Sequence, residues 1–237
     1  MLCVCLPTYN ERDNLELMVD ALQNVLGDGD LVLVIDDSSP DGTGEIADRL
    51  ATERRGVHVL HRPRKEGLGP AYLDGFRRAL ELGADLIFEM DCDFSHDPAD
   101  VRRLAAEAED ADLVIGSRYV DGGGTKNWGL VRRLISRGGS LYAQVLLGVG
   151  VRDLTGGFKC YRRVVLETID LDAIHSKGYA FQIETTYRAL RRGFRVVEVP
   201  IVFVDRQVGG SKMSKAIVLE AVWKVPALRL ASLRARG

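Results

Sequence analysis

Two carboxylates only two residues apart, Asp91 and Asp93, stand at the end of the apolar run 85–91. Negative charges at such short range repel, so a nearby group must offset them. Mg²⁺ and Mn²⁺ prefer oxygen ligands, and Mg²⁺ commonly uses one or two carboxylates together with water and substrate phosphates. The spacing therefore suits a divalent-cation site at a strand end. A motif this short is equally compatible with capping of a helix that begins at Pro98, for which Asp97 is best placed.

A second acidic pair, Asp36 and Asp37, ends the apolar run 31–37 and leads into the turn-forming residues Ser-Ser-Pro-Asp-Gly. A carboxylate at the end of the second strand is well placed to accept hydrogen bonds from a ribose or a base. The same residue types also form turns without any ligand. Two adjacent acids exceed what a turn requires, which favours a binding role.

Basic residues that could hold an anion occur in two groups: Arg118, Arg132, Arg133 and Arg137 around the Gly-rich stretch 121–129, and Arg206 with Lys212 around Val-Gly-Gly-Ser. Arginine binds phosphate through paired, charge-assisted hydrogen bonds. Helix periodicity sends the members of the first group to different faces, so at least Arg133 or Arg137 is expected to be a solvated surface charge. Arg206 and Lys212 bracket two glycines, as in a loop that closes over an anion.

These residues must be positioned by a regular alternation of elements. Apolar strand candidates at 2–6, 31–37, 57–61, 85–91 and 112–117 alternate with amphipathic helical patterns at about 11–26, from near Asp41, at 71–82 and at 98–108. Apolar strands separated by helices predict a parallel α/β sheet covered on both faces. Ligands of such sheets bind beyond the carboxyl ends of the strands. Three acidic features lie there, namely Asp36 with Asp37, Asp91 with Asp93, and Asp121, so we expect them to share one site.

The second half of the chain is less regular. Gly-rich stretches at 121–129 and 153–158 predict a loop and a turn, and the apolar run 194–205 predicts a strand interrupted by Pro200. The stretch from about Met213 to Arg234 has a helical pattern that Pro226 should kink.

Composition excludes several classes of protein. The 237 residues carry a net charge of −2, which gives no general attraction to nucleic acid or an anionic membrane. The four Cys form no C-x-x-C pair, and buried free thiols are expected for them. No signal peptide and no apolar run approaching the ~20 residues of a membrane span is evident. These features predict a soluble protein of a reducing compartment.

Seven segments in this order resemble one family: LPTYNERDNL, VIDDSSPDGT, MDCDFSHDP, GSRYVDGGG, LTGGFKCYRR, GYAFQIE and VPIVFVDR with a following SK. Together they are similar to the dolichol- and polyprenol-phosphate mannose synthases of glycosyltransferase family 2, from about Leu6 to Lys212. The resemblance implies a GT-A fold, with a mostly parallel central sheet between helices. It also implies inverting transfer of mannose from GDP-mannose to polyprenyl phosphate, with Mg²⁺ or Mn²⁺.

By position, the family pattern assigns Asp91 and Asp93 to the metal, and Arg206 and Lys212 to the donor phosphates. It assigns Arg118, Arg132 and Ser136 to the lipid phosphate. The residues assigned to the guanosine nucleotide are Pro7, Tyr9, Glu11 and one of Asp36 and Asp37. Some relatives have Gln as a third metal ligand where this chain has Ser95. A hydroxyl ligates weakly or through water, so the third ligand stays open. No role is assigned to His96.

The resemblance divides the chain into a catalytic domain, 1–212, and a C-terminal amphipathic helix, 213–237. Many relatives carry C-terminal transmembrane helices, which this sequence lacks. The C-terminal helix either packs on the core or rests on the bilayer. We therefore expect a cytoplasmic protein held peripherally at the cytoplasmic face of the membrane, by its own surface or by a membrane-protein partner.

Three other functions remain compatible with parts of the sequence. A UDP-glucose-dependent polyprenyl-phosphate glucosyltransferase would share the fold and the paired carboxylates. A sugar nucleotidyltransferase would be expected to open with a Gly-rich, Arg-containing loop, whereas this chain has PTYNERDN. A non-catalytic nucleotide-sugar-binding subunit would be expected to have lost the carboxylates or the Arg/Lys loop, and both are present.

Overall fold

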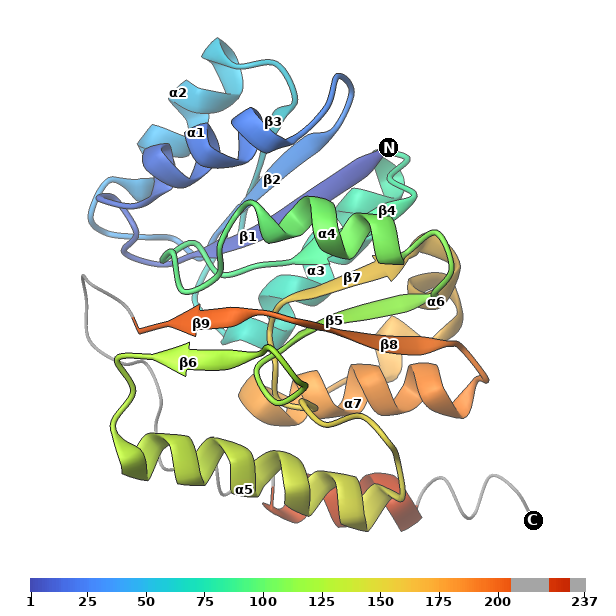
Figure 1. Ribbon diagram of the computed structural model, residues 1–237. Coiled ribbons are helices and arrows are strands. Elements are labelled where there is room, and N and C mark those ends of the chain that lie inside the picture. Colours follow the sequence, from blue (N-terminus) through green and yellow to red (C-terminus); the bar gives the residue numbers. More distant parts are fainter. Residues whose placement is uncertain (206–221, 231–237) are drawn as a thin grey trace.

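A computed structural model of the protein describes residues 1–205 and 222–230 (Figure 1). The strands are β1 (Leu2–Thr8), β2 (Leu31–Asp36), β3 (Val57–His61), β4 (Leu86–Glu89), β5 (Leu113–Ser117), β6 (Gly124–Lys126), β7 (Lys159–Arg162), β8 (Val196–Pro200) and β9 (Val202–Val204). The helices are α1 (Leu15–Val25), α2 (Thr43–Glu53), α3 (Leu68–Glu81), α4 (Asp100–Glu107), α5 (Leu130–Leu147), α6 (Arg163–Thr168) and α7 (Gly178–Arg191), with a 3₁₀ turn at Leu171–Ala173. Residues 222–230 are also helical.

Within this part of the chain, seven strands form one sheet in the order β3-β2-β1-β4-β7-β5-β8. All neighbouring strands run parallel except β7, which is antiparallel to both β4 and β5. The expected mostly parallel sheet is therefore confirmed. The sequence analysis missed β7, because Lys-Cys-Tyr-Arg does not read as an apolar run although its first three residues are buried.

The sheet is covered by helices on both faces, as predicted. One core cluster joins the sheet to α1, α2 and α4, and the other joins it to α3, α5, α6 and α7 (Figure 1). All four cysteines are buried and unoxidised, in agreement with the expectation of free thiols. None of the helices in the described ranges is long and apolar enough to cross a membrane.

Helix boundaries differ from the sequence prediction where side chains hold the preceding loop. Helix α1 begins at Leu15 rather than Glu11, because Asn10 has a φ of 58° and the main-chain N–H of Glu11 donates to Thr43 Oγ1. Helix α2 begins at Thr43, whose N–H donates to Asp41 Oδ1, so Asp41 caps from just outside the helix. Both turns place polar groups at the sheet's carboxyl edge.

The predicted strand 194–205 divides at Pro200, as expected. Its first part, β8, extends the large sheet beside β5, and its second part, β9, pairs with β6 in a separate two-stranded sheet. Strand β6 lies within the stretch predicted as a loop. The main-chain N–H of Val204 in β9 donates to the carbonyl oxygen of Ser95, which ties β9 to the loop after β4.

Candidate active site

A cavity of ≈ 500 Å³ opens at the carboxyl edge of the sheet. Its lining combines the end of β1, the segments that follow β1, β2, β3, β4 and β5, the turns before α5 and β7, and residues of α3, α5, α7 and β9: Pro7, Thr8, Tyr9, Glu11, Asp37, Lys65, Gly67, Leu68, Ala71, Asp91, Cys92, Asp93, His96, Arg118, Trp128, Arg132, Thr155, Gly157, Lys177, Gly178, Tyr179, Gln182 and Phe203. The structure thus places Asp37 in the lining of one cavity with Asp91 and Asp93. Asp121 does not line this cavity: its side chain is fully exposed, with Oδ1 3.7 Å from Arg152 Nη1.

The paired carboxylates Asp91 and Asp93 occupy the loop that leaves β4. Asp93 is buried and its Oδ1 accepts a hydrogen bond from the N–H of Ser95 at 3.0 Å. Helix α4 begins only at Asp100, and it is Asp97 that accepts from the N–H of Ala99 in the preceding turn. Capping therefore does not explain the pair, which faces the cavity.

Two carboxylates facing the same cavity suit a hard cation such as Mg²⁺ or Mn²⁺. Within residues 1–205 and 222–230, no three His, Cys, Asp or Glu side chains lie close enough to hold an ion by themselves. Water and substrate phosphates would therefore supply the remaining ligands, as is usual for Mg²⁺. The donor set fits a cation that binds together with a nucleotide.

The open question of a third ligand concerns Ser95 and His96. Ser95 is absent from the cavity lining, and its buried hydroxyl has no hydrogen-bond partner in the described chain. His96 does line the cavity, with its Nε2 3.9 Å from Asp91 Oδ2. Burial lowers the pKa of His96 to about 4, so this imidazole is neutral near pH 7.

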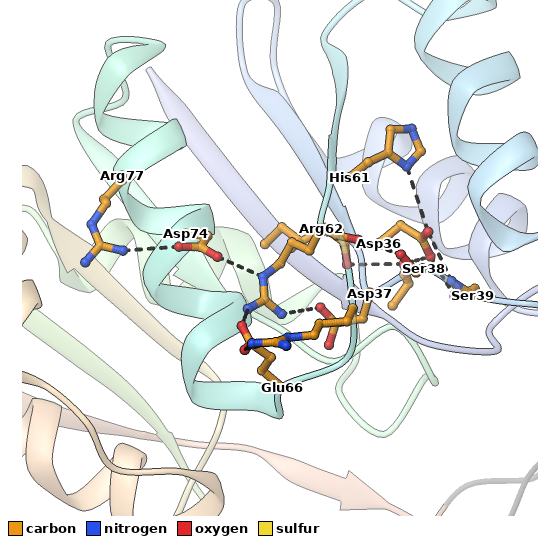
Figure 2. A network of polar contacts seen from close by, with 12 residues as sticks. Asp36, Asp37, Ser38, Ser39, His61, Arg62, Glu66, Asp74 and Arg77 are labelled. Carbon is orange, nitrogen blue, oxygen red and sulfur yellow. Dashed lines mark hydrogen bonds and ion pairs between the residues drawn. The ribbon is translucent and has the colours of Figure 1, made fainter.

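The two acids after β2 have different surroundings, one in the turn and the other at the cavity (Figure 2). Asp36 accepts hydrogen bonds from the Ser39 hydroxyl at 2.6 Å and the Thr8 hydroxyl at 3.4 Å, and it is not among the cavity-lining residues. Asp37 does line the cavity and forms a buried ion pair with Arg62. Asp37 therefore faces the cavity, whereas Asp36 holds the turn.

Arg62 is the centre of the network in Figure 2. Its guanidinium also contacts Asp74 at 2.8 Å and Glu66 at 3.2 Å, so several acids share one cation. Burial raises the pKa of Asp37, and the Arg62 guanidinium opposes that rise. Arg62 was not foreseen from the sequence, because its partners come from separate elements.

Arg118 and Arg132 both reach the cavity, but each has an acidic partner. Asp153 accepts from Arg118 Nε at 2.7 Å and from Nη2 at 2.6 Å, with both side chains buried. Burial alone would lower the pKa of Arg118, but the Asp153 carboxylate outweighs it and raises that pKa. Arg132 Nη1 lies 2.5 Å from Asp205 Oδ1 and the guanidinium covers the Trp128 ring at 4.3 Å.

Other predicted residues fall as follows. Ser136, one turn after Arg132 on α5, accepts a hydrogen bond from the Tyr119 hydroxyl at 2.8 Å and lines a second, mostly apolar cavity of ≈ 240 Å³. That cavity shares Arg132, Thr155 and Tyr179 with the first one. Arg133 and Arg137 are exposed, which confirms them as surface charges. Arg206 and Lys212 lie outside the described residues.

The nucleotide-side predictions Pro7, Tyr9 and Glu11 all line the cavity. Lys65 lies over the Tyr9 ring, with its Nζ 3.7 Å from the ring centroid. The sequence analysis passed over Lys65 because it follows the third strand in a loop with no recognisable motif. Asp153 was missed although it opens the Gly-bearing segment DLTGGF, and that acid before two glycines was the available signal.

Below the cavity, two buried side chains of opposite charge stand on the neighbouring central strands β4 and β7. Glu89 and Lys159 are register partners across β4 and β7, and both are fully buried. The Tyr161 hydroxyl donates to Glu89 Oε1 at 2.9 Å, and Lys159 Nζ donates to the main-chain oxygen of Gln182 at 2.8 Å. Burial lowers the pKa of Lys159 to about 8 and raises that of Glu89, while each charge opposes the shift of the other.

Known proteins are similar to this chain in sequence and in fold. A model of the family "Glycosyl transferase family 2" matches residues 3–170. The chain belongs to this family. It is 52% identical over 235 residues to the undecaprenyl-phosphate mannosyltransferase of Micrococcus luteus, covering 98% of this chain and 96% of that one. It is 50% identical over 224 residues to the polyprenol monophosphomannose synthase of Mycolicibacterium smegmatis, covering 94% and 84%.

These relatives confirm the resemblance to the polyprenol-phosphate mannose synthases. Among solved structures, glucosyl-3-phosphoglycerate synthase from Mycobacterium tuberculosis is similar, with a TM-score of 0.72, 19% identity and coverage of 96% of this chain and 79% of that one. A structure of that enzyme with Mn²⁺, UDP-glucose and phosphoglyceric acid also gives a TM-score of 0.72, at 18% identity and coverage of 97% and 79%. At this identity the likeness concerns the fold, and it confirms the expected GT-A fold of this family 2 glycosyltransferase.

The buried Glu89–Lys159 pair predicts a marked asymmetry between single and double substitution. Lys159→Met leaves an uncompensated carboxylate in the core and is expected to lower the free energy of unfolding by about 3–5 kcal/mol. Glu89→Gln combined with Lys159→Met removes both charges and should recover more than half of that loss. Urea denaturation measures both; a double variant no more stable than the single one would show that the pairing is unimportant.

Proposed function

We propose that this glycosyltransferase moves mannose from GDP-mannose to a polyprenyl phosphate, with inversion to a β-linked polyprenyl-phosphate mannose. The observation that carries the proposal is that one cavity contains both a group of acidic and nucleotide-side residues and a pair of arginines. The paired carboxylates and the nucleotide-side residues lie at one part of the lining, and Arg118 and Arg132 lie at another, beside the apolar cavity. The names of the two relatives at 52% and 50% identity support the same reaction.

The donor end of the proposal rests on residues that the cavity gathers. Asp37 is held by Arg62 and faces the cavity, where it can accept hydrogen bonds from the ribose or base of the nucleotide. Tyr9 presents an aromatic face beside Lys65. Arg206 and Lys212 complete the proposed donor site by offsetting the charge of the diphosphate.

Asp91 and Asp93 would hold the divalent cation, Mg²⁺ or Mn²⁺. When bound there, the ion would offset the negative charge that develops on the departing diphosphate. The related fold of glucosyl-3-phosphoglycerate synthase has been crystallised with Mn²⁺ and with Mg²⁺, which supports divalent ions in general.

The acceptor end is proposed to work mainly by positioning. A phosphate monoester has a second pKa of about 6 and is mostly dianionic at neutral pH, so it needs little help from a general base. Arg118 is fixed by Asp153 as a rigid cation, and Arg132 has a buried Nε with no hydrogen-bond partner in the described chain. Holding the phosphate oxygen in line with the sugar carbon is then the chief contribution of these residues.

The lipid end is proposed to lie along α5, which exposes large apolar side chains at helical spacing: Leu130, Val131, Leu134, Ile135, Leu141 and Val145. Such a contiguous apolar surface is unusual on a soluble protein unless it contacts a partner or a membrane. Because Arg132 and Ser136 of this helix line the cavities, a bilayer at its outer face would bring the lipid phosphate to the site. We therefore assign the occupant of this face as the cytoplasmic surface of a membrane.

Residues 222–230 of the predicted C-terminal helix are compatible with both roles considered for it, packing on the core and resting on the bilayer. Val225 is fully buried in the core, whereas Trp223 and Leu230 are 74% and 59% exposed. Its first described turn lies beside α5, where the Tyr142 hydroxyl donates to the carbonyl of Val222 at 2.8 Å (Figure 1). We propose that residues 222–230 pack on the catalytic unit and present Trp223 to the same membrane.

Transfer of radiolabel from GDP-mannose to polyprenyl phosphate tests the function directly. We expect a chloroform-soluble mannosyl product that is alkali-stable as a β-linked phosphodiester, and no comparable product from UDP-glucose. EDTA should reduce the rate at least about 100-fold, and added Mg²⁺ or Mn²⁺ should restore it. Efficient transfer from UDP-glucose alone would favour the glucosyltransferase, and full activity in EDTA would contradict the metal site.

Arg132→Ala separates acceptor binding from donor binding. Loss of a charge-assisted phosphate contact should reduce kcat/KM for polyprenyl phosphate by about 10- to 100-fold. The dissociation constant of GDP-mannose, measured by calorimetry, should stay within about twofold. Arg137→Ala, an exposed arginine on the same helix, is the matched control and should behave as wild type. An equal loss of donor affinity in Arg132→Ala would contradict the acceptor assignment.

The apolar face of α5 predicts membrane binding by the full chain. Val131→Glu with Leu134→Glu should weaken partition onto anionic liposomes at least about tenfold, since each buried apolar side chain contributes about 1.5–3 kcal/mol. Leu17→Glu on α1, at a side chain that is 60% exposed, provides the control and should leave partition unchanged. Equal liposome binding by the double variant and wild type would exclude α5 as the membrane-facing surface.

A further inference from the structure

Gln182, in the GYAFQIE segment on α7, is a cavity residue to which no role has yet been given. Its side chain is only 2% exposed, and neither its amide nitrogen nor its amide oxygen has a hydrogen-bond partner in the described chain. Burying an amide without partners is costly, so such groups in folded proteins usually mark a missing water, ion or ligand. Because this amide borders the cavity, a bound molecule can supply the partner.

The backbone beneath this side chain is firmly held. Lys159 Nζ donates to the carbonyl oxygen of Gln182 at 2.8 Å, and the Thr185 hydroxyl donates to the same oxygen at 3.2 Å. Lys159 is itself paired across the strands with Glu89. A clamped main chain limits where the amide can point, which is the usual arrangement of a residue that orients a ligand.

The position of Gln182 relative to the other groups indicates which part of the ligand it meets. Lys159, which holds the Gln182 carbonyl, is the register partner of Glu89, and Asp91 follows Glu89 by two residues in the loop after β4. On the other side, a Cβ at Gly157 would lie 3.5 Å from Gln182 Nε2, and Gly157 follows Thr155, which accepts from Arg118. Gln182 therefore lies between the proposed cation site and the proposed phosphate-binding arginines.

We propose that Gln182 hydrogen-bonds a hydroxyl of the transferred sugar and thereby contributes to the choice of donor hexose. The inference rests on the proposed function, in which the sugar lies between the donor diphosphate and the acceptor phosphate. An amide can donate and accept at once, as a sugar hydroxyl does. It also adds no negative charge beside Glu89 and Asp91, which a carboxylate would do.

The test compares Gln182→Met with wild type in the transfer assay, using GDP-mannose and its 2-, 3-, 4- and 6-deoxy analogues. Methionine keeps the length of the side chain and removes the amide, and Gln182→Leu is the second variant should the first not fold. We expect kcat/KM with GDP-mannose to fall roughly 10- to 100-fold, with a melting temperature equal to or above that of wild type, since an unpaired buried amide has been removed.

One deoxy donor should identify the bound hydroxyl. Wild type should lose a similar factor with that donor, and Gln182→Met should lose little more, because both changes delete the same hydrogen bond. Thr186→Val is the matched control: Thr186 lies one turn further along α7 with a buried, unpartnered hydroxyl outside the cavity lining, and its variant should keep kcat/KM within about twofold.

The possible results distinguish a failure of the proposed sugar contact from a failure of the proposed function. If wild type transfers mannose but Gln182→Met matches it, or if its losses add to those of every deoxy donor, the sugar contact is wrong and the mannosyltransferase stands. If wild type transfers no mannose from GDP-mannose, the proposed function and the sugar contact both fall.

Discussion

The mutual repulsion of carboxylates at one edge of the sheet is the constraint around which this site is organised. Parallel strands end at the same edge, so the acids that follow them are forced into one small volume. Acids at or below the cavity are offset by basic side chains from other elements: Asp37 by Arg62, Asp153 by Arg118, Glu89 by Lys159 and Asp205 by Arg132. The protein can therefore concentrate negative charge where a divalent cation would be useful without disrupting its fold.

The antiparallel strand β7 makes this arrangement possible. It inserts between β4 and β5, and so places Lys159 directly opposite Glu89 beneath the loop of the paired carboxylates. The segment that leads into β7 carries Asp153, which fixes Arg118, and Gly157, which leaves room beside Gln182. One change of strand direction thus supplies both the support under the paired carboxylates and the carboxylate that fixes Arg118.

A second theme is the contrast between the two ends of the cavity. At the β1 and β2 side, hydrogen bonds and the Arg62 network hold polar residues in a rigid turn. At the α5 side, the lining becomes aromatic and apolar, with Trp128, Phe203 and the adjoining second cavity. This gradient matches a reaction in which one substrate is a water-soluble nucleotide and the other a lipid phosphate. It also explains why a helix with an exposed apolar face directly borders the site.

The fold of the first half was predictable from the sequence, because long apolar strands alternating with amphipathic helices leave few alternatives. The boundaries were less predictable: the start of α1 depends on a hydrogen bond from Glu11 to Thr43, 32 residues away. Strand β7 could not be recognised from the sequence, because it begins with a lysine, a residue type that is normally exposed, although Lys159 is buried here. Its burial is tolerated because its ammonium donates to the Gln182 carbonyl and the Thr185 hydroxyl, and because the opposite charge of Glu89 lies on the neighbouring strand.

By itself, the sequence determined which chemical groups were present and which strands the acids followed: the pairs Asp36/Asp37 and Asp91/Asp93 were found from residue type and local spacing. The resemblance to the mannose synthases singled out Arg118 and Arg132. Local pattern carries such information because strand ends and turns are local features. Only the tertiary structure showed that Asp37 lines the cavity and that Asp36 and Ser95 do not. It also revealed Asp153 as the partner of Arg118, Arg62 as the partner of Asp37, and Lys159 as the donor to the Gln182 carbonyl. Those decisions depend on contacts between residues distant in the chain, where the balance of burial and charge is set by neighbours that no short motif contains.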